Sequence, residues 1–147
     1  MSLAEGIAKK IGGVGPGAGA TGLVYSETGN ANVFVGAMPP SPNRCVTVIP
    51  SGGYESDSKL PYDNPTFQIM VRGDEDARWA LMMANRVYSL LQGFRNTYLE
   101  DSDDTWLVSV IAQQSGPAHL GDDDNGRVQY TMNYEAEIRN PTTERPG

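Results

Sequence analysis

The chain has 147 residues, and its 11 Lys and Arg against 18 Asp and Glu give a formal net charge of -7. One domain is the default at this length. An acidic chain is a poor candidate for holding nucleic acid, because that work needs clustered Lys and Arg to neutralise phosphates. Seven of the acids fall in two short runs, residues 100–104 (EDSDD) and 122–124 (DDD), and the other 11 acids match the 11 bases. The two runs therefore carry the whole net charge.

Composition excludes several other classes of protein. The single cysteine, Cys45, rules out an internal disulfide and lies in the apolar run CVTVI, so we expect it to pack as a small hydrophobe. No apolar stretch approaches the ~20 residues of a membrane helix. The first residues lack the apolar core of a signal peptide. The sequence therefore predicts a soluble protein made inside a cell.

The first third of the chain predicts one short helix and two strands. Apolar residues repeat on one face over residues 2–11, which indicates the helix. Residues 12–22 (GGVGPGAGATG) are glycine-rich and predict a flexible connection. Strands are expected over 32–36 and 45–49, and the proline-rich residues between them predict a loop.

Residues 50–65 (PSGGYESDSKLPYDNP) carry three prolines and two glycines, which predicts a long loop. A loop of this length in a compact domain is usually functional or disordered. This one contains Tyr54, Leu60 and Tyr62, and disordered linkers tend to lack such side chains. We therefore expect it to be ordered against another surface.

The next residues predict a strand followed by the main helix. Residues 66–72 (TFQIMVR) alternate apolar and polar side chains, as a half-buried strand does. Asp74 then fits a helix cap, and Gly93 fits a helix end. The main helix is therefore expected over about 74–92.

The predicted main helix carries two adjacent apolar stripes, which is more than one sheet face can bury. The first stripe consists of Ala77, Leu81, Ala84, Tyr88 and Leu91, and the second of Trp79, Met83, Val87 and Leu90. Two interpretations of the second stripe stay open. Either a loop or the N-terminal helix covers it, or it forms a subunit contact built on Trp79 and Met83, since aromatic residues and Met are enriched at interface cores.

The last third of the chain predicts strands joined by polar loops. Residues 96–99 predict a short strand, 105–113 a buried strand and 115–126 a loop. Residues 127–138 alternate strictly through six apolar and polar pairs, which predicts a long strand with one wet or interface-facing side. Residues 140–147 form a polar tail.

The order of these elements predicts the fold class. One main helix cannot supply the crossovers that a doubly wound parallel sheet needs. We therefore expect an α+β domain over residues 1–147, with a largely antiparallel sheet packed by the main helix and the short N-terminal helix.

No motif indicates catalysis, a cofactor or a metal site. The glycines of GAGATG at 17–22 match a dinucleotide-binding pattern, but no strand precedes them and no helix follows. The run DDDNG at 122–126 fails the EF-hand spacing, because Met132 stands where a Glu ligand is needed. We expect a tight turn there, with its acids in solvent or a lumen. His119, the single histidine, has no triad or ligand motif around it. The residues favour an assembly component over an enzyme.

Several motifs, taken in order, resemble the bacteriophage tail terminator proteins, a group often labelled minor capsid proteins of siphophages. The motifs are VFVG at 33–36 with PPSP at 39–42, GGY at 52–54 through LPYDNP at 60–65, FQIMVRG at 67–73 leading into the main helix, and residues 121–127 before the long alternating strand. The resemblance extends over residues 3–138.

This resemblance implies a structural virion protein that is not an enzyme and needs no cofactor. Such proteins form a ring, here expected to be a hexamer, which caps the tail tube, ends its polymerisation and provides the surface that joins the head. The implied partners are other copies of the chain, the tail tube protein and a head-completion or stopper protein, with DNA only as passing cargo and no membrane. The chain would be made in the host cytoplasm and act in the tail or neck of the virion.

The resemblance also directs attention to two sets of residues. A ring needs two different contact faces on each subunit, and the candidates are Tyr54, Leu60, Tyr62, Trp79 and Met83. Acidic side chains lining the channel would repel the phosphates of passing DNA, and the candidates are Glu100, Asp101, Asp103, Asp104, Asp122, Asp123 and Asp124. The competing interpretation is that both acidic runs are ordinary solvated loops.

Two other functions stay open on the sequence. Another neck component, such as a head-closure or tail-completion protein, would share the size and the ring symmetry. A small acidic enzyme or ligand-binding domain would use His119 or the aspartate run.

Overall fold

The computed structural model describes residues 3–12, 23, 25, 32–56, 58–99 and 105–146. These residues form two helices and eight strands, in the order α1 (Leu3–Ile11), β1 (Val33–Val35), β2 (Cys45–Gly53), β3 (Tyr62–Asp63), β4 (Pro65–Arg72), α2 (Ala77–Leu91), β5 (Thr97–Tyr98), β6 (Trp106–Ala112), β7 (Ala118–Asp122) and β8 (Val128–Arg139). The glycine-rich connection predicted at 12–22 lies, apart from Gly12, outside the described residues.

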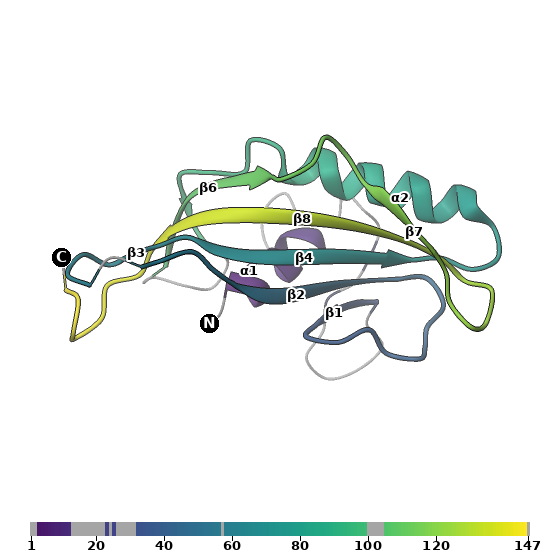
Figure 1. The fold of residues 1–147 in the computed structure, drawn as a ribbon, viewed down its shortest axis with the longest axis horizontal. Coiled ribbons are helices and arrows are strands. Elements are labelled where there is room, and N and C mark those ends of the chain that lie inside the picture. Colours follow the sequence, from purple (N-terminus) through teal and green to yellow (C-terminus); the bar gives the residue numbers. More distant parts are fainter. Residues whose placement is uncertain are drawn as a thin grey trace.

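All eight strands belong to one sheet. Its main order is β1-β2-β4-β8-β6-β5, and β3 and β7 also pair with β8. β1 runs parallel to β2, and the other pairs are antiparallel. In Figure 1, α1 lies behind β2, which it contacts, and α2 lies near β8. The predicted α+β class, with a largely antiparallel sheet, one main helix and a short N-terminal helix, is confirmed.

The long strand β8 confirms the alternation predicted for it. One edge of β8 pairs with β3 and β4, and the opposite edge pairs with β6 and β7. Buried and half-exposed residues alternate along most of the strand. The buried set is Val128, Met132, Tyr134, Ala136 and Ile138, with Thr131 as an added buried residue.

The core lies between one face of this sheet and both helices. At its centre, Phe67 of β4 stacks on Tyr134 of β8, with ring centroids 5.2 Å apart and an interplanar angle of 13°. Each of these residues is 1% exposed. The helices add Ile7 and Ile11 from α1 and Met83, Ala84, Val87 and Leu91 from α2 to the same cluster. α1 and α2 therefore cover the same face of the sheet.

The opposite face of the sheet carries mostly polar side chains. Residues paired across strands share a face, and Glu135 of β8 pairs with Thr66 on one side and with Ile111 on the other. Near this point the Gln113 side-chain amide donates a hydrogen bond to the Tyr54 hydroxyl, 3.3 Å away.

α2 starts later than the sequence predicts. Its N-cap is Asp76, whose side chain accepts the Arg78 N–H at 3.0 Å. The predicted cap, Asp74, instead accepts the N–H of Asp76 at 2.9 Å, which makes a turn ahead of the helix. α2 ends at Leu91, and Gly93 follows with a φ of +74°, in line with the predicted stop. No helix in the described ranges is long and apolar enough to span a membrane.

Two segments predicted as loops contain strands. Within 50–65, β2 runs on to Gly53, β3 forms, and β4 begins at Pro65; within 115–126, β7 forms. These pieces are short, and register shifts in β2 and β7 interrupt any alternation. The partners of β3 lie far along the chain, at Ile138 and Arg139 of β8. β7 pairs with the nearby start of β8, but it is too short and irregular for a local pattern to predict it.

Replacing Phe67 with Ala should destabilise the protein strongly, because it removes a ring from the centre of the core. We expect the free energy of unfolding to fall by about 3–5 kcal/mol, the usual cost of deleting a buried aromatic side chain. Chemical denaturation measures this change. Leu120→Ala, at a residue that is 51% exposed, is the control and should change stability by less than about 0.5 kcal/mol. Equal, small effects at the two positions would contradict the assigned core.

Candidate functional site

Three of the predicted contact residues, Tyr54, Leu60 and Tyr62, lie on one element. We call it the hairpin arm, residues 50–66, where β2 and β4 continue towards their shared turn at the left of Figure 1. Its two sides approach closely at Gly53, where an added Cβ would lie 2.5 Å from the carbonyl oxygen of Asn64. Only glycine allows this approach.

The hairpin arm exposes its large side chains. Tyr54 is 60% exposed, Leu60 50% and Tyr62 38%. The backbone beneath them is nevertheless fixed, since the Tyr54 N–H donates to the carbonyl oxygen of Asn64 at 3.0 Å. Apolar side chains gathered on a fixed, exposed element are typical of a protein contact surface.

Trp79 and Met83, the other two predicted contact residues, are placed differently. Met83 faces the sheet and is only 2% exposed, so it is not available as a contact residue in the folded subunit. Trp79 packs against the core, and the Arg44 guanidinium lies over its ring, 5.2 Å from the centroid. The second stripe is thus largely covered by its own chain. The large apolar side chains that α2 exposes are Leu81 and Met82.

Of the two acidic runs, the structure describes only residues 122–124. Residues 100–104 lie outside the described residues, so the roles of Glu100, Asp101, Asp103 and Asp104 stay predictions. Residues 122–124 lead into the tight turn between β7 and β8 that the sequence predicts, closed by a hydrogen bond from the Gly126 N–H to the Asp123 carbonyl oxygen at 3.0 Å. Asp122 and Asp124 are exposed.

Asp123, by contrast, is turned into its own loop. Its carboxylate accepts the backbone N–H groups of Asn125 and Arg127, both at 2.9 Å, and pairs with the Arg127 Nε at 2.6 Å. Partial burial raises the pKa of Asp123, but these hydrogen bonds outweigh it and hold the pKa below its usual value. Asp123 therefore offers no free negative charge to a channel, contrary to the expectation for this residue.

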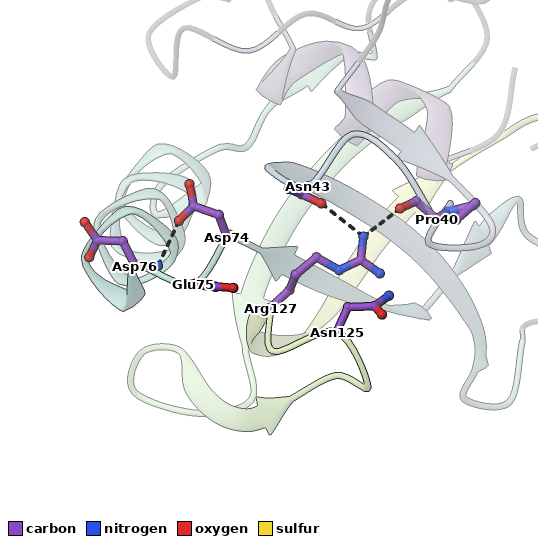
Figure 2. Close-up of a pocket in the computed structure, with 7 residues that line it drawn as sticks. All are labelled: Pro40, Asn43, Asp74, Glu75, Asp76, Asn125 and Arg127. Carbon is purple, nitrogen blue, oxygen red and sulfur yellow. Dashed lines mark hydrogen bonds between the residues drawn. The ribbon is translucent and has the colours of Figure 1, made fainter.

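Arg127 and Arg72 anchor the proline-rich loop between β1 and β2. Arg127 Nη1 donates to the Pro40 carbonyl oxygen at 2.6 Å and to Asn43 Oδ1 at 3.3 Å (Figure 2). Arg72, 3% exposed, donates to the carbonyl oxygens of Pro42 at 2.6 Å and Asn43 at 3.1 Å. The planar guanidinium suits such multiple contacts. The sequence holds no pattern that predicts them.

An open cavity of about 670 Å³ lies where this loop meets the start of α2 and the β7–β8 turn. Asp74 pairs there with Arg44 at 2.9 Å, and Asp76 caps α2. Across the described residues, no group of three or more His, Cys, Asp or Glu side chains is placed to hold a metal ion. The cavity is lined by Pro40, Asn43, Asp74, Glu75, Asp76, Asn125 and Arg127, as Figure 2 shows.

Cys45 is buried, and His119 lies beside an aromatic ring. Burial raises the pKa of the Cys45 thiol, and the charges of Arg72 and Arg127 offset this only in part. The thiol contacts the Met38 sulfur at 3.0 Å, so Cys45 packs as the small hydrophobe that the sequence predicts. His119 lies on β7 with its ring 5.3 Å from that of Tyr130.

Asp123→Asn should destabilise the protein most near neutral pH. The folded-state pKa of Asp123 is lowered, so its stabilising effect is present above the unfolded value of about 3.9 and is lost as the pH falls through the folded value. Denaturant titrations at about pH 7, 5 and 3 should show the gap between wild type and variant shrinking at the lowest pH. Asp124→Asn, in the same run, is the control. A gap that does not depend on pH would contradict the assigned ion pair.

Comparison with known proteins identifies a similar fold and a matching family. A chain in the virion of a native gene transfer agent particle has a similar fold, with a TM-score of 0.56 and 19% sequence identity over 74% of this chain and 78% of that one. No curated protein sequence matches the chain. The family model for the bacteriophage tail terminator protein matches residues 8–140, which include the hairpin arm, α2 and β8. The resemblance read from the motifs is thereby confirmed: the chain belongs to the bacteriophage tail terminator family and is a structural component of the phage virion.

Proposed function

We propose that the protein forms a ring, expected to be a hexamer, that caps the tail tube, ends its polymerisation and provides the surface for joining the head. The observation that carries this proposal is the match of the tail terminator family over residues 8–140. The mechanism is the fitting of complementary surfaces, in which no bond is made or broken. The partners are the tail tube protein on one side and the head-completion or stopper protein on the other.

The ring contacts are assigned to two separate surfaces of each subunit, because a closed ring joins unlike faces. The first surface is the hairpin arm with Tyr54, Leu60 and Tyr62, all exposed. Tyr is among the residues that supply most of the binding energy at interfaces. The second is the outer side of α2. Leu81, 43% exposed, and Met82, 46% exposed, take the role there that the sequence suggested for Trp79 and Met83.

The acidic residues of the β7–β8 turn are assigned to the channel. Asp122 and Asp124 are exposed, and neither forms an ion pair with another described residue. A lumen lined by carboxylates repels the phosphates of DNA, so DNA passes without being held. The run at 100–104 is proposed to add to the same lining.

Removing the apolar side chains of the hairpin arm should weaken ring formation. We expect Tyr54→Ala combined with Leu60→Ala to lower subunit affinity by about 10- to 100-fold, the range for losing interface anchor residues. Light scattering over a concentration series measures the ring, and electron microscopy of phage assembled with the variant should show overlong tails. Leu120→Ala, at a similarly exposed residue on β7, is the control. Tails of normal length that fail to join heads would instead support a head-closure or tail-completion role.

Reversing the charge of the β7–β8 turn should make the assembled ring retain DNA. We expect Asp122→Lys with Asp124→Lys to bind duplex DNA at low salt and to release it as salt increases, since Lys–phosphate contacts displace counterions. A filter-binding assay over a salt series measures this. The control is Glu55→Lys with Glu144→Lys, an equal charge change at exposed positions on the hairpin arm and the C-terminal segment, away from this turn. Equal DNA binding by the two double variants would contradict the channel assignment.

A further inference from the structure

Residues 140–145 fold back against the hairpin arm through contacts that begin in the core. The Thr105 side chain, in a residue only 4% exposed, donates its hydroxyl to Asn140 Oδ1 at 3.0 Å. The Asn140 N–H in turn donates to the carbonyl oxygen of Pro61 at 2.7 Å. The chain leaving β8 is thus tied on one side to the core and on the other to the arm.

The next residues close a turn that orients Arg145. The Thr142 N–H donates to the Arg145 carbonyl oxygen, and the Arg145 N–H donates to Thr142 Oγ1, both at 3.1 Å. From this turn the Arg145 guanidinium reaches the arm. Its Nη1 and Nη2 bind the two carboxylate oxygens of Asp63 at 3.1 and 2.9 Å, and Nη1 also donates to the Leu60 carbonyl oxygen at 3.1 Å.

The Arg145–Asp63 pair differs from an ordinary surface ion pair. Its side chains are 21% and 27% exposed, whereas those of the Arg78–Asp76 pair are 91% and 43% exposed. A two-point contact of guanidinium and carboxylate fixes geometry as well as distance, and lower exposure reduces screening by water and salt. The pair can therefore hold the arm in one position.

The backbone of the arm binds residues 140–145, whereas its large side chains remain exposed. The carbonyl oxygens of Leu60 and Pro61 are bound by residues 140–145, while the Leu60 side chain stays 50% exposed. Tyr62 pairs with Arg139 in the sheet, and the residue remains 38% exposed. The backbone of the arm is thus held by hydrogen bonds, while its apolar side chains are exposed to a partner.

We propose that residues 140–145 brace the hairpin arm in a preformed docking conformation, with Arg145 as the positioning residue. The inference rests on the proposed role of the arm in subunit contacts and specifies what prepares it. A surface that is already ordered loses less conformational entropy when a second copy of the chain binds. Arg145 acts through the arm, so its loss should weaken docking while every docking side chain remains.

The test uses cleavage by trypsin after Lys59, an exposed residue of the arm, because the rate of cleavage increases as the local backbone opens. In the full-length protein, Arg145→Gln should raise the rate of cleavage at Lys59 about fivefold, with little change in the melting temperature. The exchange Asp63→Arg with Arg145→Asp should restore the slow rate. Arg145→Lys should restore it only in part, because an ammonium group lacks the planar fork. Arg78→Gln, which breaks the exposed pair at α2, should leave the rate unchanged.

An unchanged rate of cleavage at Lys59 in Arg145→Gln overturns the brace. Ring assembly is then measured by light scattering, and the proposal expects Arg145→Gln to weaken it by about the same fivefold factor. Faster cleavage with unchanged assembly would overturn the docking role of the arm and leave the bracing contact established. Since Tyr54→Ala with Leu60→Ala removes docking side chains without touching the brace, failure of the further inference and failure of the proposed function are distinguishable.

Discussion

Two-sided pairing of β8 is the constraint on which the rest of the structure depends. Along most of its 12 residues, the strand pairs with β3 and β4 on one edge and with β6 and β7 on the other. Because buried backbone groups must find hydrogen-bond partners, this pairing sets the register of four other strands and decides which of their side chains enter the core. The end of β8 also holds β3 in the hairpin arm, and its start holds β7 beside the acidic turn.

Arginine side chains fix the segments that the sheet leaves without regular pairing. Arg72 and Arg127 bind carbonyl oxygens of the loop between β1 and β2, and Arg145 binds the hairpin arm. A guanidinium can satisfy several acceptors at once, which suits irregular backbone that has few partners of its own. The same contacts change the meaning of the net charge of -7. Arg127 neutralises Asp123, so the acidic turn offers two free carboxylates rather than three.

Residue patterns predicted the parts of the fold that are long and regular. β8, β4 and α2 follow from periods of two and 3.6 residues, and β6 follows from its β-rich composition. β3 and β7 were missed because each is short and owes its strand conformation to β8. The arm residues Tyr54, Leu60 and Tyr62 are exposed, and their contact role stays a prediction. Met83 is buried, which the sequence could not show, since a wide apolar stripe does not reveal how far the sheet covers it. Arg145 contacts Asp63 across 82 positions, a separation at which no local pattern exists.

The core closes within one chain, with Phe67, Tyr134 and the buried sides of both helices in a single cluster. The free energy that folds the subunit therefore does not come from its neighbours, whereas the proposed contacts lie on the hairpin arm and the outside of α2. If a subunit engages the growing tail as proposed, substitutions on these surfaces alter how strongly and how early it does so, while its fold is unaffected. Under the proposed function, selection can then tune the timing of tail termination as a trait separate from the stability of the protein.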